Sequence, residues 1–121
     1  MTAYRQVTHV DTGEVLVPRA RWCDSFGSKL RGFTLRRTLA LDDGLVLVQS
    51  SESRINSAIH MLFVFFDLGV IWVDDAGAVV DTALARPWRL HYAPGAPARY
   101  VVEAHPDVLD QVRVGDLIRF D

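Results

Sequence analysis

The side chains that we single out for acid and base catalysis are His60, Glu52 and Glu103. A histidine beside a carboxylate transfers protons near neutral pH, and such pairs serve many hydrolases and lyases. This leaves open a small hydrolase-like or lyase-like enzyme that uses His60 with Glu52 or Glu103. The competing interpretations are a core histidine bonded to a backbone carbonyl and a Glu103 that forms an ion pair with an arginine.

A second set of side chains suits ligand binding. Arginine forms forked hydrogen bonds with carboxylates and phosphates, and aromatic rings between arginines add stacking. The candidate ligand-binding residues are Arg36, Arg37, Arg54, Arg86, Trp88, Arg89 and Tyr92. We therefore predict first a binding module for an anionic or polar ligand, or for a segment of a partner protein, beside residues 86–92. The alternative is that the arginines pair with surface acids and that Trp88 packs its own loop.

Metal and cofactor chemistry has little support in the sequence. The four histidines are scattered without ligand spacing, and Cys23 is the single cysteine. No glycine-rich phosphate loop and no Gly-x-Ser-x-Gly elbow is present. We expect no metal and no cofactor, and we expect Cys23 to be a buried structural thiol.

Length and composition predict one compact domain over residues 1–121, since half of the residues are hydrophobic.

The net charge of -2 argues against a general nucleic-acid binder. The apolar run at residues 58–73 is shorter than the roughly 20 residues of a membrane-spanning helix. The N-terminus has no apolar leader, so we predict a cytoplasmic location. The oligomeric state is left open.

The elements that must position these side chains are mainly strands. Residues 58–74 are nearly all apolar and rich in Phe, Val, Ile and Trp, which predicts two adjacent strands buried on both faces. Further strands are expected at residues 4–10, 14–18, 45–48, 78–84, 100–104 and 116–120, and a long proline-containing loop at 86–99.

Two short helices complete the prediction. Trp22, Phe26, Leu30 and Phe33 recur at helical spacing, and residues 106–113 begin with a proline suited to a first turn. The predicted fold is mainly β (α+β), a small antiparallel sheet or open β-barrel of about seven to eight short strands with two short helices. Long helices are too scarce for a parallel βαβ arrangement.

Several motifs follow one another in a recognisable order. They are Leu30-Arg31-Gly32-Phe33, Arg36-Arg37, Asp43-Gly44-Leu45, Ile59-His60-Met61, Val70 to Asp74, Gly77 with Val79-Val80, Val102-Glu103 and Gly115-Asp116. This order resembles the domain-of-unknown-function family 192, which comprises small bacterial and archaeal proteins. The resemblance implies a compact, β-rich fold and supplies no activity.

One position departs from that family. Many members have proline, an aliphatic residue and aspartate where this chain has Asp67, Leu68 and Gly69. Gly69 therefore cannot perform any role of that aspartate. Asp67 is the nearest carboxylate, two residues earlier, where the geometry need not be equivalent.

Overall fold

The computed structural model describes residues 3–25, 28–29, 32–33, 36 and 38–121. The mainly β prediction is confirmed, because the regular structure of these residues is a seven-stranded sheet with very little helix. The elements are β1 (Ala3–His9), β2 (Val15–Cys23), β3 (Gly44–Ser53), β4 (Leu68–Val73), β5 (Val79–Ala85), β6 (Ala98–Ala104), the 3-10 helix η1 (Pro106–Asp110) and β7 (Ile118–Phe120). No helix in this part of the chain is long and apolar enough to cross a membrane.

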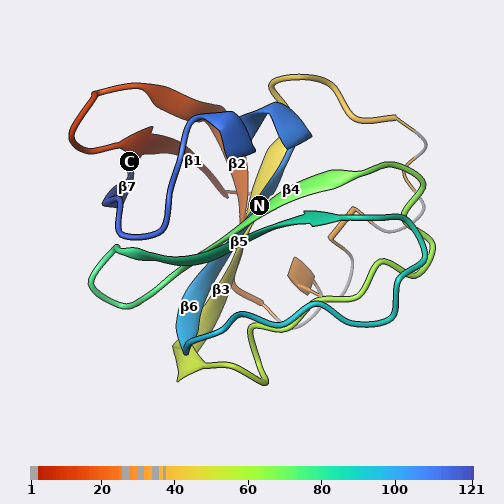
Figure 1. Ribbon diagram of the computed structural model, residues 1–121. Helices are drawn as coiled ribbons and strands as arrows, with labels where there is room; N and C mark the ends of the chain where they lie inside the picture. The colour runs from red at the N-terminus through yellow and green to blue at the C-terminus, as the bar shows by residue number, and fades with distance from the viewer. Residues whose placement is uncertain (1–2, 26–27, 30–31, 34–35, 37) are drawn as a thin grey trace.

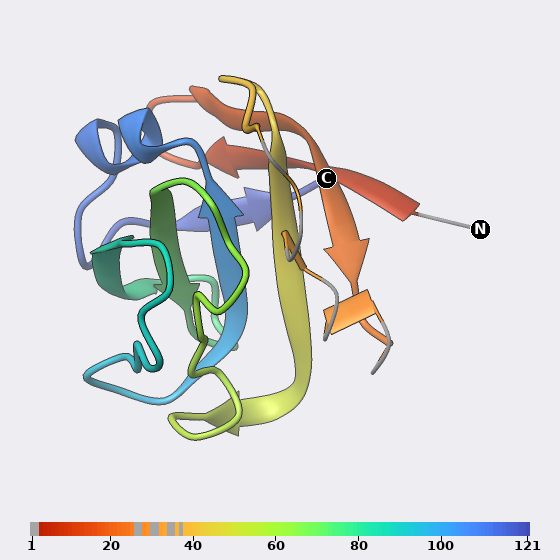
Figure 2. The ribbon, with the colours of Figure 1, turned by 90° about the vertical axis from the view of Figure 1, so that its right-hand side faces the viewer.

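The sheet curls into a half-barrel with the strand order β5-β4-β6-β3-β2-β1-β7 (Figures 1 and 2). Its two edge strands approach each other at one end, where a bridge joins Ala78, just before β5, to Leu117, just before β7. Such contact between the edges covers part of the backbone that an open sheet leaves unpaired. The predicted open barrel is therefore confirmed in outline.

One strand pair differs from the predicted antiparallel arrangement. β2 runs parallel to β3 and pairs with it from Arg21–Leu45 to Cys23–Leu47, whereas every other neighbouring pair in the sheet is antiparallel. A parallel pair needs a long crossover, which residues 24–43 provide. The strand expected at residues 14–18 is longer than predicted, because β2 continues past Pro18 to Cys23.

Both faces of the central strands are buried, which explains their continuous apolar sequences. β4 is buried at all six positions. Along it Val70 and Trp72 belong to one hydrophobic cluster, while Ile71 and Val73 belong to another. The second cluster draws side chains from all seven strands and from η1, and the first is covered by irregular segments that include residues 57–66. This covered outer face holds the candidate site.

The prediction of two strands within residues 58–74 is wrong for the first half of the run. Only β4 is a strand, and residues 60–67 form an irregular segment with a turn at residues 62–63. Met61 and Val64 are buried, whereas Phe63 and Phe65 are exposed, so the expected common face does not exist. In a run that is apolar throughout, no alternation separates a strand from a buried loop.

The two-helix prediction is also wrong. Trp22 lies in β2, and Phe26 and Leu30 lie outside the described residues. Residues 28–29 are helical, and the N–H of Gly32 donates to the carbonyl of Ser28 at 3.2 Å. The second helix is the short 3-10 helix η1, which starts at Pro106 as expected but ends at Asp110.

Gly69 has a packing role in this fold. A Cβ atom there would lie 2.8 Å from the Cγ1 atom of Val108 and 3.1 Å from the carbonyl oxygen of His105. The absence of a side chain thus lets η1 approach β4. Asp67 does not reach this position, because its carboxylate lies 3.5 Å from the Arg86 guanidinium.

Candidate functional site

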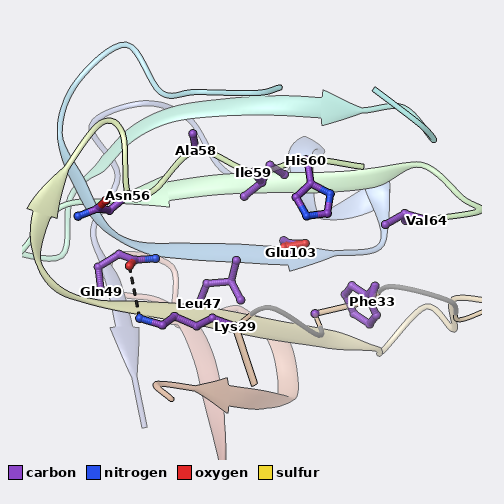
Figure 3. A pocket seen from close by; sticks show the side chains of 11 residues that line it. Lys29, Phe33, Leu47, Gln49, Asn56, Ala58, Ile59, His60, Val64 and Glu103 are labelled. Atoms are coloured by element: carbon purple, nitrogen blue, oxygen red, sulfur yellow. Dashed lines mark hydrogen bonds between the residues drawn. The ribbon is translucent and has the colours of Figure 1, made fainter. Parts of the chain in front are cut away.

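A pocket of about 360 Å³ lies between β3, β6 and the irregular segment that precedes β4 (Figure 3). Its apolar wall comes from Phe33, Leu47, Ala58, Ile59 and Val64, and its polar groups come from Lys29, Gln49, Asn56, His60 and Glu103. The volume and the mixture of an apolar wall with a few polar groups are typical of a small-molecule site.

Glu103 is the buried acid of this pocket. Its side chain is 6% exposed, and its backbone pairs with Leu45 of β3 and Val70 of β4. Burial raises the pKa of Glu103 to about 7, and the positive charge of Arg21 opposes this rise. The Arg21 guanidinium donates to the carbonyl of Gly32 at 2.6 Å rather than to the carboxyl group. Within the described residues Glu103 forms no ion pair, so the expected arginine partner is not found there.

His60 lies at the rim of the same pocket, over Glu103 (Figure 3). The residue is exposed, and its Nδ1 atom accepts a hydrogen bond from the N–H of Leu62 at 3.2 Å. In the neutral ring this bond places the proton on Nε2. The interpretation of His60 as a core histidine bonded to a carbonyl is therefore wrong. His60 and Glu103 line one pocket, and their catalytic role stays a prediction.

Sequence reasoning missed three polar residues of the pocket, Lys29, Gln49 and Asn56. The Nζ atom of Lys29 lies 3.5 Å from the Oε1 atom of Gln49, and both line the wall facing His60 (Figure 3). Lys29 is the single lysine among 13 basic residues, and this was the available signal. Gln49 had none, since it lies at the end of an apolar stretch of β3.

Glu52 does not belong to this site. Its Oε2 atom accepts a hydrogen bond from the N–H of Asp75 at 2.7 Å, which ties the end of β3 to the turn after β4. The prediction that Glu52 assists His60 is thus not supported by the geometry.

The predicted ligand-binding arginines do not gather at the pocket. Arg36 forms an ion pair with Asp43 at 3.0 Å, and Arg54 donates to the carbonyl of Pro94 at 3.1 Å. Arg86 pairs with Asp67, and Arg37 lies outside the described residues. The Arg36 guanidinium lies 5.4 Å from the ring centroid of Phe33, which lines the pocket.

The loop containing Arg86 to Tyr92 supports the pocket wall from outside. Tyr92 and Ile59 form a β-bridge, and the N–H of Met61 donates to the carbonyl of Arg89 at 2.7 Å. The Tyr92 hydroxyl accepts a hydrogen bond from the N–H of Arg86 at 2.9 Å. None of these loop side chains lines the pocket, so the loop contributes through its backbone.

Metal ligands do not gather in the part of the chain that the structure describes. No three side chains of His, Cys, Asp or Glu lie there as a group that could hold a metal ion. Cys23 is buried as predicted, but it lies in β2. Burial raises the pKa of its thiol, which favours the unreactive protonated form.

The model of the protein family DUF192, described as "Uncharacterized ACR", matches residues 7–120 of this chain. The chain belongs to DUF192. A UPF0127 protein of Thermococcus sibiricus is 36% identical over 111 residues, covering 90% of this chain and 70% of that protein. A UPF0127 protein of Thermococcus gammatolerans is 37% identical over 111 residues, covering 90% of this chain and 71% of that protein.

Two solved structures share the fold of this DUF192 chain. A protein of unknown function from Novosphingobium aromaticivorans has a TM-score of 0.79 at 18% identity, covering 98% of this chain and 84% of that chain. A protein from Sinorhizobium meliloti, described as a candidate transcription regulator, has a TM-score of 0.83 at 17% identity, covering 98% and 95%. At these identities the likeness shows the fold alone.

Proposed function

We propose that this DUF192 domain is a binding module for a small polar ligand that enters the pocket and bonds Glu103. The observation that carries the proposal is a buried carboxyl group at a pocket whose wall combines apolar side chains with a few other polar groups. Buried polar groups normally have hydrogen-bond partners, and a ligand N–H or O–H group would provide one.

The rim of the pocket indicates what the outer end of the ligand carries. Lys29 and His60 both lie there, and Gln49 and Asn56 add amide groups. The positive charge of Lys29 attracts a carboxylate or phosphate, whereas Glu103 prefers a donor. We therefore favour a ligand with a donor group at its inner end, an apolar middle and an anionic or polar outer end.

A small hydrolase-like or lyase-like enzyme is the second candidate. Its support is the pKa of about 7 for Glu103 together with His60 at the same pocket. A carboxyl group with a pKa near the working pH serves as a general acid or base. This alternative differs from simple binding because it requires turnover that depends on both His60 and Glu103.

The binding proposal is tested by nuclear magnetic resonance with a panel of amino acids, hydroxy acids and primary amines. We expect at least one class to shift backbone signals of residues 58–60 and 49, and Glu103→Gln to weaken its binding about tenfold. Glu52→Gln is the matched control, because it removes an exposed carboxylate outside the pocket. Equal weakening by both variants, or shifts confined to residues 86–92, would contradict a ligand bonded to Glu103.

A further inference from the structure

An apolar patch lies on the loops outside the pocket. It consists of Phe63, Phe65 and Trp88, whose side chains are 50%, 45% and 49% exposed. Between ring centroids, Trp88 lies 5.0 Å from Phe63 and 5.7 Å from Phe65. We call these three residues the aromatic patch. None of them lines the pocket, so the patch is a separate feature.

The backbone beneath the aromatic patch is in an unfavourable conformation. Phe63 has a φ of 59° and Trp88 a φ of 68°, and among the described residues these are the only non-glycine positions with positive φ. Bulky L-residues rarely adopt this region, because Cβ approaches the following carbonyl. The N–H of Trp88 donates to the carbonyl of Met61 at 2.8 Å, which joins the two loops. Strain of this kind persists where the surrounding structure maintains it, often at a functional site.

The charge around the aromatic patch is opposite in sign to that of the whole chain. Residues 58–67 and 84–92 contain two arginines and one aspartate, a net charge of +1, whereas the whole chain carries -2. Asp67 lies 3.5 Å from Arg86, and Arg89 is exposed. The patch is therefore suited to an anionic surface.

We propose that the aromatic patch docks this domain onto an anionic lipid surface. Trp and Phe side chains favour the level of the lipid headgroups, and neighbouring arginines bind lipid phosphates. A second copy of the chain fits poorly, since a two-fold contact would place arginines against arginines. An acidic protein is the competing occupant. The rings pack on each other rather than around a slot for a partner's side chain, and this favours lipid.

The test uses the complete domain with vesicles of phosphatidylcholine, with or without phosphatidylglycerol. We expect the protein to sediment with the phosphatidylglycerol vesicles and its tryptophan emission to shift to shorter wavelength. Trp88 should dominate that shift, because it is the exposed one of the three tryptophans: Trp72 is buried, and Trp22 is partly buried beneath the Arg5 guanidinium. Rising salt should release the protein, since exposed charges are screened.

Two variants separate lipid docking from folding. Trp88→Asn removes the central ring, and asparagine tolerates left-handed backbone, so we expect the unfolding midpoint to stay close to wild type. Vesicle affinity should fall by about tenfold or more. Arg89→Glu should lower the affinity for the vesicles by about five-fold or more. The matched control is Leu41→Ser, which removes a 68% exposed side chain before β3 and should bind like wild type.

Two results overturn the proposal. One is wild-type protein that remains in the supernatant with phosphatidylglycerol vesicles at low salt. In that case salt-sensitive binding of polyglutamate would assign the patch to an acidic protein, and concentration-dependent sedimentation without vesicles would assign it to a second copy. The other is a folded Trp88→Asn variant that binds vesicles as tightly as wild type.

Discussion

At the scale of single residues, Glu103 is the least expected feature of the fold. It occupies a position on β6 between two apolar partners, where a valine or leucine would pack without desolvating a charge. Burying a carboxyl group costs stability, and its retention is typical of functional sites. That cost can be measured without knowing the ligand.

Replacing Glu103 with glutamine should stabilise the domain at alkaline pH. The folded pKa is about 7 against an ordinary value of 4.5, so the folded state holds a proton that the unfolded chain has released. This group's contribution to stability is therefore greatest below the ordinary pKa and declines as pH rises through about 7, by roughly 3 kcal/mol. Urea unfolding at about pH 4.5 and about pH 8 should show this decline in wild type and not in Glu103→Gln. An identical decline in the two proteins would refute the assignment to Glu103.

Asp116 has the opposite dependence on pH. Its carboxylate accepts a hydrogen bond from the N–H of Arg113 at 2.8 Å and lies 3.0 Å from the Nε2 atom of His9. These two contacts hold the pKa of Asp116 below its ordinary value of 3.8, and the hydrogen bond from Arg113 has the larger effect. Its contribution is thus present above that value and is lost as pH falls through the folded pKa.

We therefore expect Asp116→Asn to lower the thermal unfolding midpoint near neutral pH. The difference from wild type should shrink as the solution is acidified below the ordinary pKa. Asp42→Asn, at an exposed position before β3, provides the comparison. A deficit in Asp116→Asn that persists unchanged in acid would point to packing rather than to the carboxylate charge.

At the scale of elements, the contact between η1 and β4 depends on Gly69. In Gly69→Ala the new Cβ would meet the His105 carbonyl, which is backbone and cannot rotate away. We expect a loss of about 2 kcal/mol in the free energy of unfolding, measured by urea denaturation. Gly95→Ala is the matched control, because its Cβ would lie 3.6 Å from the nearest atom, at ordinary contact distance. Comparable losses in the two variants would show that Gly69 matters through chain flexibility instead.

The elements themselves differed in how readily the sequence revealed them. The hairpin of β1 and β2 and the strand β5 were predictable, because turn residues such as Asp11 to Gly13 separate alternating stretches. The segment before β4 was not predictable. It is a loop, and its apolar side chains cover one face of the sheet. There Trp72 donates through Nε1 to the carbonyl of Ser57 at 2.8 Å, so burial of this segment does not require strand pairing.

At the scale of the whole molecule, curling of the sheet and the covering segments create the pocket. Gly32 and Phe33, Ile59 and His60, and Glu103 come from three distant parts of the chain and meet at one wall. These are also three of the segments that carry the family resemblance. Arg36, Arg54 and Arg86 remain outside because each finds an acid or a carbonyl on its own side of the fold.

The sequence by itself determined the family and the β-rich class, and it singled out His60 and Glu103 as candidates. These depend on residue type and local pattern, which a linear chain carries in full. Only the tertiary structure decided that Glu52 lies away from the pocket and that Lys29 and Gln49 line it. It also decided that the loop from Arg86 to Tyr92 supports the pocket wall through its backbone. These outcomes depend on which faces meet when the sheet curls, and contacts between residues far apart in the chain leave no local signal.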